Sequence, residues 1–176
     1  MSAILSIRLA KEDFKFSVAH FTIFDDSRAE PLHGHNYRMA IEIEGDDVGA
    51  DEIGLLADCD RWKRAVRATC AALDDKVLLA AAHPGVAIET GGGSLVCRFA
   101  GREYRFPESE VLPLPLVNIS MELLAGWVWH RLAPEAAGSR VRALAVEIEE
   151  TPGQLCRYRR VISQDWTLRT DHPPAP

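Results

Sequence analysis

The stretch LHGHNYRMAIEIE, residues 32–44, sets a strand register that decides the fold. Side chains at positions i and i+2 of a β-strand point to the same face of the sheet. His33 and His35 therefore share a face. The alternate residues that follow on that face are apolar: Tyr37, Met39, Ile41 and Ile43. The opposite face carries charge: Arg38, Glu42 and Glu44. We expect one long strand whose buried face ends in two histidines.

A second alternating run, FKFSVAH at residues 14–20, also ends in a histidine. If the two strands pair, His20, His33 and His35 converge. Three protein ligands that leave a fourth position open are typical of a catalytic zinc, whereas structural zinc sites are closed by four ligands. The spacing therefore predicts a zinc site, with solvated or hydrogen-bonded strand histidines as the alternative.

The rest of the chain predicts an α+β domain over residues 1–170, followed by a frayed, Pro-rich tail at 171–176. The fold class we expect is an antiparallel four-stranded sheet with two helices on one face and an inserted β element. The expected elements are a first strand at 4–21 broken near 11–13, the strand at 32–44, a helix from about Asp60, the insert at 84–115, a helix capped by Ser120 and ended by Pro134, and strands at 141–150 and 155–165.

Composition narrows the class of protein. The chain has 176 residues, 47% of them apolar and 26% charged, which is ordinary for a globular domain. A net charge of −6 disfavours binding to nucleic acid or to an anionic membrane surface. The four cysteines are widely spaced, and no apolar window approaches the length of a membrane span. We expect a cytoplasmic protein with reduced thiols.

A carboxylate ends the apolar stripe of a later strand. Leu144, Val146 and Ile148 alternate, and Glu150 is the next residue on their face. A buried carboxylate without a partner is costly, so Glu150 is expected to bind something. The alternative is that the strand has ended and Glu150 lies in water.

Five segments together carry a family resemblance. FSVAH (16–20) and LHGHNY (32–37) resemble the zinc signature of the 6-pyruvoyltetrahydropterin synthase and 6-carboxytetrahydropterin synthase family. ALDD (72–75), NISME (118–122) and EET (149–151) resemble later family segments in the same order. The resemblance implies a tunnelling fold (T-fold) and a zinc-dependent pterin lyase. It also implies that Glu150, Thr151, Ser120 and Glu122 bind the pterin.

The resemblance also implies an assembly. Proteins of this kind close their sheets into a barrel, commonly a homo-oligomer of two stacked trimers, with active sites between subunits. In such a hexamer Glu150 would serve a neighbour's zinc. Unpaired strand edges in a small sheet agree with this expectation.

The chain departs from the family at its proton-transfer groups. The family uses a cysteine assisted by an Asp–His pair. No cysteine lies between His20 and His33 here, and Asp75 stands where that histidine would be. Glu30 lies three residues before His33, which resembles the type III variants in which glutamate replaces the cysteine. Those variants act in folate biosynthesis. We therefore expect Glu30 to be catalytic, with Asp74 and Asp75 either assisting it or only ending a helix.

Three functions remain open at this point. The preferred one is cleavage of the side chain of 7,8-dihydroneopterin, or of its triphosphate, to 6-hydroxymethyl-7,8-dihydropterin. The second is a lyase of the 6-pyruvoyl or 6-carboxytetrahydropterin synthase type with a base other than cysteine. The third is a pterin- and zinc-binding homologue without catalysis.

Overall fold

The computed structural model describes residues 3–47 and 54–162. The end of the strand expected at 155–165 and the tail expected at 171–176 lie outside these residues. The elements, in chain order, are β1 (Ile4–Leu9), β2 (Lys15–His20), β3 (His33–Asp46), α1 (Cys59–Leu73), β4 (Lys76–Ala80), β5 (Ala87–Gly91), β6 (Ser94–Phe99), β7 (Arg102–Pro107), β8 (Val111–Leu114), α2 (Met121–Leu132), β9 (Val141–Thr151) and β10 (Gln154–Val161).

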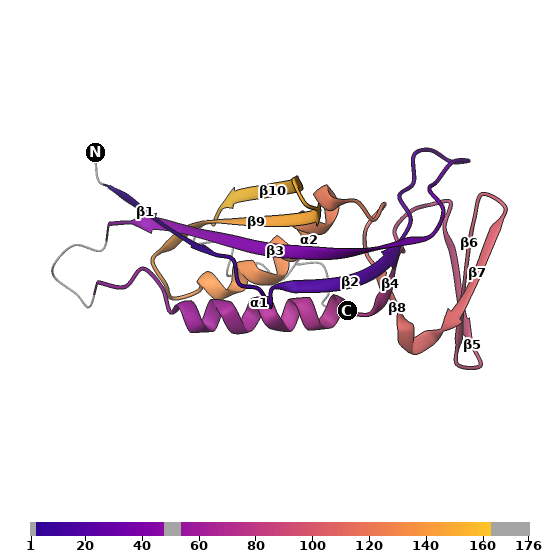
Figure 1. Ribbon diagram of the computed structural model, residues 1–176, viewed down its shortest axis with the longest axis horizontal. Coiled ribbons are helices and arrows are strands. Elements are labelled where there is room, and N and C mark those ends of the chain that lie inside the picture. The colour runs from indigo at the N-terminus through magenta and orange to yellow at the C-terminus, as the bar shows by residue number, and fades with distance from the viewer. Residues whose placement is uncertain (1–2, 48–53, 163–176) are drawn as a thin grey trace.

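One large sheet organises the fold. Its strand order is β10-β9-β3-β2-β4-β8, and β1 pairs with β3 beyond the end of β2. Both helices lie along one face of this sheet (Figure 1). The α+β class with two helices is confirmed. The first strand is indeed broken: a turn in which the Phe14 N–H donates to the Lys11 carbonyl separates β1 from β2.

The prediction of a four-stranded antiparallel sheet was wrong. Within residues 3–47 and 54–162 the sheet has seven strands and is mixed, because β4 runs parallel to β2, and β8 runs parallel to β4. Both missed strands are short, and their residues do not alternate between apolar and polar. β4 reads KVLLA directly after a helix, and β8 contains Pro113. A short apolar run beside a helix does not distinguish helix from strand by its periodicity.

The long strand β3 has the predicted register. Its alternate residues Tyr37, Met39, Ile41 and Ile43 are buried, with exposed fractions of 3% or less. Its partner β2 runs antiparallel, so that His20 lies opposite His33, and Val18 lies opposite His35. The core between sheet and helices therefore ends at the histidines.

The two helices seal the core. Asp58 caps α1 by accepting the N–H groups of Asp60 and Arg61, and the helix buries Trp62 and Val66 against the sheet. Ser120 caps α2, as predicted, and α2 packs on β9 and β10. Each buried side chain of this size contributes about 1.5–3 kcal/mol. Among the described residues no helix is both long and apolar enough to cross a membrane.

The insert forms a separate three-stranded sheet, β5-β6-β7, beside the main one (Figure 1). Its inner face buries Leu95, Cys97 and Phe99, as the alternation predicted. The rings of Phe99 and Tyr104 stack on Phe21, with centroids 6.2 and 5.8 Å away. The insert thus packs against the segment that follows His20.

Candidate metal centre and active site

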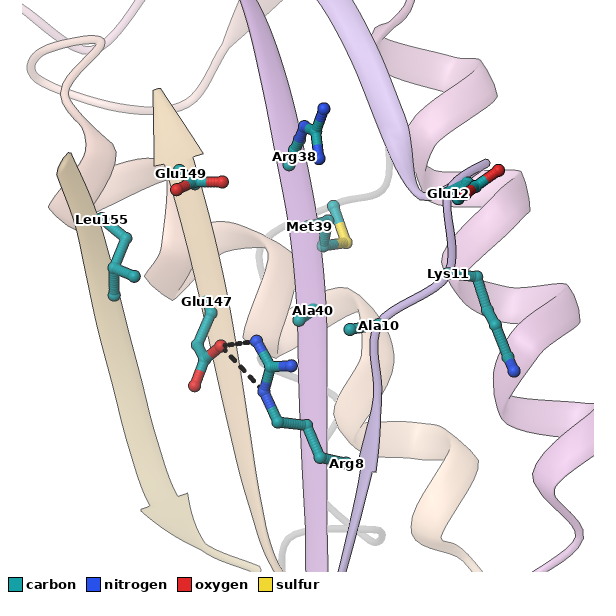
Figure 2. Close-up of a pocket in the computed structure, with 10 residues that line it drawn as sticks. All are labelled: Arg8, Ala10, Lys11, Glu12, Arg38, Met39, Ala40, Glu147, Glu149 and Leu155. Atoms are coloured by element: carbon teal, nitrogen blue, oxygen red, sulfur yellow. Dashed lines mark hydrogen bonds and ion pairs between the residues drawn. The ribbon is translucent and has the colours of Figure 1, made fainter. Parts of the chain in front are cut away.

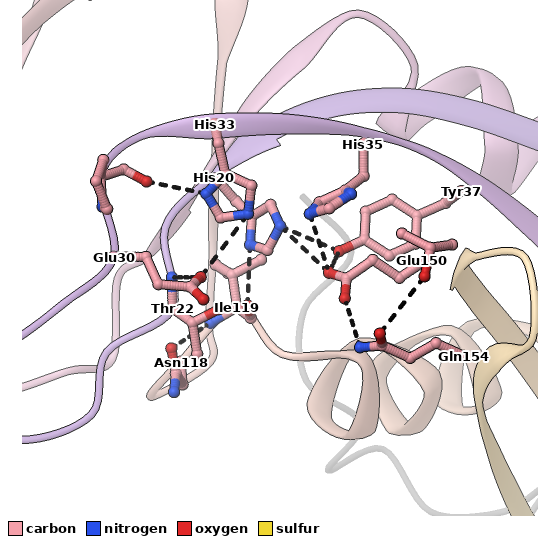
Figure 3. A network of polar contacts seen from close by, with 12 residues as sticks. His20, Thr22, Glu30, His33, His35, Tyr37, Asn118, Ile119, Glu150 and Gln154 are labelled. Carbon is pink, nitrogen blue, oxygen red and sulfur yellow. Dashed lines mark hydrogen bonds and ion pairs between the residues drawn. The ribbon is translucent and has the colours of Figure 1, made fainter.

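The three predicted histidines converge. One ring nitrogen from each of His20, His33 and His35 lies within 4.8 Å of the other two (Figure 3). His20 is buried, with 1% of its surface exposed, whereas His33 and His35 are half-buried. The site is therefore anchored in the core on one side and accessible on the other.

Backbone carbonyls orient two of the rings. His20 Nδ1 lies 3.1 Å from the carbonyl oxygen of Ile119, and His33 Nδ1 lies 2.9 Å from that of Pro31. A carbonyl oxygen only accepts, so each Nδ1 carries a proton and directs it at the backbone, which leaves each Nε2 as the nitrogen on the other side of the ring. Burial lowers the pKa of His20 below its usual value, and the neighbouring His33 lowers it further. His20 is thus held as a neutral imidazole, and the Nε2 atoms of both rings are the nitrogens turned away from these carbonyls, where a metal could bind them.

Glu150 lies in this cluster and not in water. Its Oε1 accepts the Tyr37 hydroxyl at 2.6 Å, and its Oε2 accepts the side-chain N–H of Gln154 at 3.1 Å. The same Oε1 is 3.5 Å from His20 Nε2 and 3.6 Å from His35 Nε2. Burial raises the pKa of Tyr37 above its usual value, and Glu150 raises it further, so the hydroxyl keeps its proton. The carboxylate therefore has the partners that its strand pattern required.

The cluster has more hydrogen-bond acceptors than protons to share among them, which fits a bound metal cation. Tyr37 has one proton and gives it to Glu150, although its oxygen is also 3.1 Å from His20 Nε2. The lone pair of His20 Nε2 thus faces acceptors, and Glu150 faces two imidazole nitrogens. A cation held by the three histidines would satisfy all of these groups, and an all-imidazole set suits zinc.

Glu30 lies on the other side of the triad. Its Oε2 is 3.8 Å from His33 Nε2 and accepts the backbone N–H of Thr22 at 3.3 Å. Its own N–H donates to the Thr22 carbonyl at 3.0 Å, which closes the loop between β2 and β3. Glu30 is half-buried, so its carboxylate borders the accessible side of the cluster.

Comparison with known proteins identifies the family. Residues 8–161 match the family described as 6-pyruvoyl tetrahydropterin synthase. The chain belongs to this family. A putative 6-carboxy-5,6,7,8-tetrahydropterin synthase of Methanocaldococcus jannaschii is 27% identical, over 84% of this chain and 91% of the relative. A second putative synthase of this type, from Pyrococcus abyssi, is 30% identical, over 78% of this chain and 81% of the relative.

Solved structures agree with the sequence relatives. The 6-pyruvoyl tetrahydropterin synthase of Plasmodium vivax has a TM-score of 0.83 and is 25% identical, over 91% of this chain and 99% of that one. The T-fold and the family are thus confirmed. The chain is a pterin lyase of the 6-pyruvoyl tetrahydropterin synthase family, and its histidine triad fits the family's metal site.

Two further positions of the family signature, Ser120 and Thr151, each directly follow a residue that contacts the cluster. Ser120 caps α2 through its side chain, 3.4 Å from the Leu123 nitrogen, and Glu122 is exposed in the first turn. Thr151 follows Glu150 at the end of β9, and its hydroxyl is 3.4 Å from Gln154 Oε1. Ser120 directly follows Ile119, whose carbonyl orients His20, so this segment contributes to the site through its backbone.

Asp74 and Asp75 lie at the end of α1 and are exposed. Asp74 accepts the Ser17 N–H at 2.6 Å, and the Asp75 N–H donates to the Ser17 carbonyl. Asp75 and His35 both line a hollow beside β2 and β4. No hydrogen bond or ion pair joins either aspartate to the triad within the part of the chain that the structure describes.

A second hollow, on the face of the sheet without helices, does not belong to this site. Arg8, Arg38, Glu147 and Glu149 are among its lining residues, and none of the three histidines is (Figure 2). Arg8 donates to Glu147 at 2.6 Å. Because Arg8 and Glu147 already pair within the chain, two of the charges of this hollow are not directed at a ligand.

Sequence reasoning missed four contributors. Tyr37 was assigned to the core, although it shares the i, i+2 register of the two histidines and lies next on their face. The carbonyls of Ile119 and Pro31 have no side-chain signal. Arg102, from the insert, donates to the backbone of the Glu30 loop, a contact between segments far apart in the chain.

Proposed function

We propose that the chain is a zinc-dependent lyase acting on the C6 side chain of a dihydropterin, with Glu30 as the proton-transferring group. The position of Glu30 supports this proposal most directly. Its carboxylate borders the triad, 3.8 Å from His33 Nε2, in a segment between His20 and His33 that contains no cysteine. A glutamate therefore occupies the region where family members use a thiolate.

Each group around the triad has a role in this proposal. His20, His33 and His35 hold the metal. A zinc ion there polarises side-chain oxygens and lowers the pKa of bound hydroxyls. Glu150, presented by Tyr37 and Gln154, accepts hydrogen bonds from the N–H groups of the pterin ring. Thr151, Ser120 and Glu122, the other family-signature positions, are assigned to pterin binding with it.

Glu30 takes a proton from the side chain of the substrate and returns one to the carbon skeleton. Its place at the half-buried rim allows it to reach a side chain held over the triad. General acid–base catalysis of this kind contributes about 10²–10⁴-fold to a rate.

The names of the relatives favour one reaction class. They are 6-carboxy and 6-pyruvoyl tetrahydropterin synthases, which supports a reaction of that type with Glu30 as the base. Cleavage to 6-hydroxymethyl-7,8-dihydropterin, the reaction preferred from the sequence, is the second candidate, and the missing cysteine favours it. One Plasmodium vivax synthase structure is described as a catalytic-residue mutant with glutamate replaced by alanine, so glutamate catalysis occurs among the similar structures.

Product analysis by mass spectrometry distinguishes these reactions. Zinc-loaded protein is incubated with 7,8-dihydroneopterin and, separately, with its triphosphate. A pyruvoyl or carboxy product supports the first reaction, and a 6-hydroxymethyl product supports the second. Zinc and pterin binding without any product would overturn the proposed enzyme in favour of a binding protein.

Glu30→Gln tests the base. We expect turnover to fall about 10²–10⁴-fold while zinc remains bound, because the amide cannot accept the proton. Glu12→Gln, an exposed glutamate that lines the second hollow, is the matched control and should turn over normally. Full turnover by Glu30→Gln would remove Glu30 from the mechanism.

We also propose that the protein assembles as its family does, in two stacked trimers. Glu150 contacts the triad of its own chain, so the expectation that it serves a neighbour's zinc is replaced by a role within one subunit. In that assembly, we propose, Asp74 and Asp75 act on a neighbour's substrate. Light scattering gives the oligomer, and Asp74→Asn should lower turnover only in the assembled state.

A further inference from the structure

We propose that Arg102 is a positioning residue that holds the Glu30 loop against the histidine triad. The inference deepens the proposed function and rests on it, because it concerns the same base. The inserted β-sheet would then be part of the active-site architecture and not a surface decoration.

The guanidinium of Arg102 holds two successive carbonyls of the loop. Nη1 donates to the Glu30 carbonyl at 2.6 Å, and Nη2 donates to the Ala29 carbonyl at 2.9 Å. Hydrogen bonds from a charged donor are shorter and stronger than neutral ones. Two bonds from one planar group also fix the orientation of the loop backbone and not only its distance.

The hairpin places Arg102 by its own geometry. Ala100 and Gly101 both have positive φ, 47° and 77°, which makes a tight two-residue turn between β6 and β7. Arg102 is the first residue after this turn, opposite Phe99. The ring of Phe99 is buried against that of Phe21, the residue directly before Thr22. This contact fixes the turn next to the loop that contains Glu30.

The loop has two sides, and each is held by a different residue. The side chain of Asn118 holds the outgoing side, accepting the N–H of Ile23 at 2.9 Å and donating to its carbonyl at 2.8 Å. Arg102 holds the returning side at Ala29 and Glu30. Without Arg102, the bonds to Thr22 and the bridge between Ala29 and Ile23 still tie the returning side to the fixed outgoing side. The Glu30 carboxylate nevertheless gains freedom relative to His33.

The contact requires arginine and not just a positive charge. Lysine is a point charge on a flexible stem, and it cannot span two carbonyls in one plane. Arg102→Lys should therefore recover only part of what Arg102→Ala loses. Arg98→Ala is the matched control, because Arg98 lies in the same hairpin but pairs with Glu89 and Glu103, outside the loop.

Steady-state kinetics on the zinc-loaded protein provide the first test. We expect Arg102→Ala to lower kcat about 10- to 100-fold, as small displacements of catalytic groups do, with pterin KM and zinc content unchanged. Arg98→Ala should keep the kcat of the unmodified protein. An unchanged kcat in Arg102→Ala, with Glu30→Gln inactive, would overturn this inference and leave the proposed base intact.

A double variant shows whether Arg102 acts through Glu30. In the Glu30→Gln background, Arg102→Ala should cause no further loss of turnover, because residues that act as one unit are not additive. A further loss of the full 10- to 100-fold would overturn the inference.

Hydrogen exchange keeps the inference testable if Glu30 proves not to be the base. The amides of Thr22 and Glu30 should exchange faster in Arg102→Ala than in Arg98→Ala. Equal exchange in both variants would overturn the positioning role whatever the catalytic result.

Discussion

The two faces of the sheet treat their carboxylates differently. On the face without helices, Glu42 and Glu147 are bound by arginines of the same chain, with Arg157 donating to both. At the histidine end of the other face, Glu150 is held by a tyrosine and a glutamine and faces imidazole nitrogens. All three glutamates lie on the paired strands β3 and β9, and Arg157 and Gln154 lie on the neighbouring strand β10.

The difference shows which carboxylates have a counter-charge within the described part of the chain and which do not. Hydrogen bonds from Ser6 and Arg157 hold the pKa of Glu42 below its usual value, so the open face supplies its own counter-charges. At the triad Glu150 faces imidazole nitrogens, and no arginine or lysine among the described residues pairs with it, an arrangement that fits a metal ion as the counter-charge. Carboxylates that are paired with arginines of the same chain thus mark a structural surface, and a carboxylate without such a partner marks the candidate functional site.

The largest effect should come from removing a metal ligand. We expect His33→Ala to weaken zinc binding by more than about 100-fold, the upper range for losing an outer-shell group, and to abolish turnover. His33 is half-buried, so the fold should survive. Zinc content by mass spectrometry and isothermal titration gives the result.

His83→Ala is the control for this experiment. His83 lies outside the triad, and its Nδ1 accepts the Gly85 N–H. If His33→Ala retained stoichiometric zinc, the triad would be no metal centre, and the contrast between the two faces would lose its explanation.

The next largest effect compares two glutamates. Glu150→Gln should weaken pterin binding about 10- to 100-fold, because a hydrogen bond to a charged group contributes about 1.5–3 kcal/mol. Glu42→Gln, on the open face, should bind pterin as the unmodified protein does. Fluorescence titration with a pterin measures both, and equal affinities in the two variants would contradict the assignment of Glu150.

The sequence predicted the parts that depend on local pattern. The register of β3 placed His33 and His35 on one face, and the cap at Ser120 marked the start of α2. It did not predict β4, whose five residues lack alternation, or the Arg102 contact, which depends on how a hairpin docks. Contacts made by backbone carbonyls or between distant segments leave no periodic signal.

Acid should affect the two faces in separate pH windows in the metal-free protein. The folded pKa of His20 is below the usual 6.5, so the unfolded chain takes up a proton first, and the unfolding free energy falls as pH drops below 6.5. The pKa values of Glu42 and Glu147 lie below 4.5, so the stability that these two carboxylates contribute is lost only as the pH falls below 4.5. Each unit of pKa difference corresponds to about 1.4 kcal/mol.

Urea denaturation at pH 7.5, 5.5 and 4.0 tests this order. The first step, between pH 7.5 and 5.5, should be reduced in His20→Gln and unchanged in Glu42→Gln. A stability that is flat down to pH 5 in the unmodified metal-free protein would contradict the buried, neutral state of His20.

The smallest effect should come from the open face itself. Arg157→Met removes the cation shared by Glu42 and Glu147 but keeps an apolar stem over the sheet. Side chains this exposed are screened by water, so we expect a loss of about 0.2–1 kcal/mol in unfolding free energy, less in high salt, with zinc content and turnover unchanged. A loss of turnover would show that the two faces are coupled, and the open face would then belong to the functional part of the molecule.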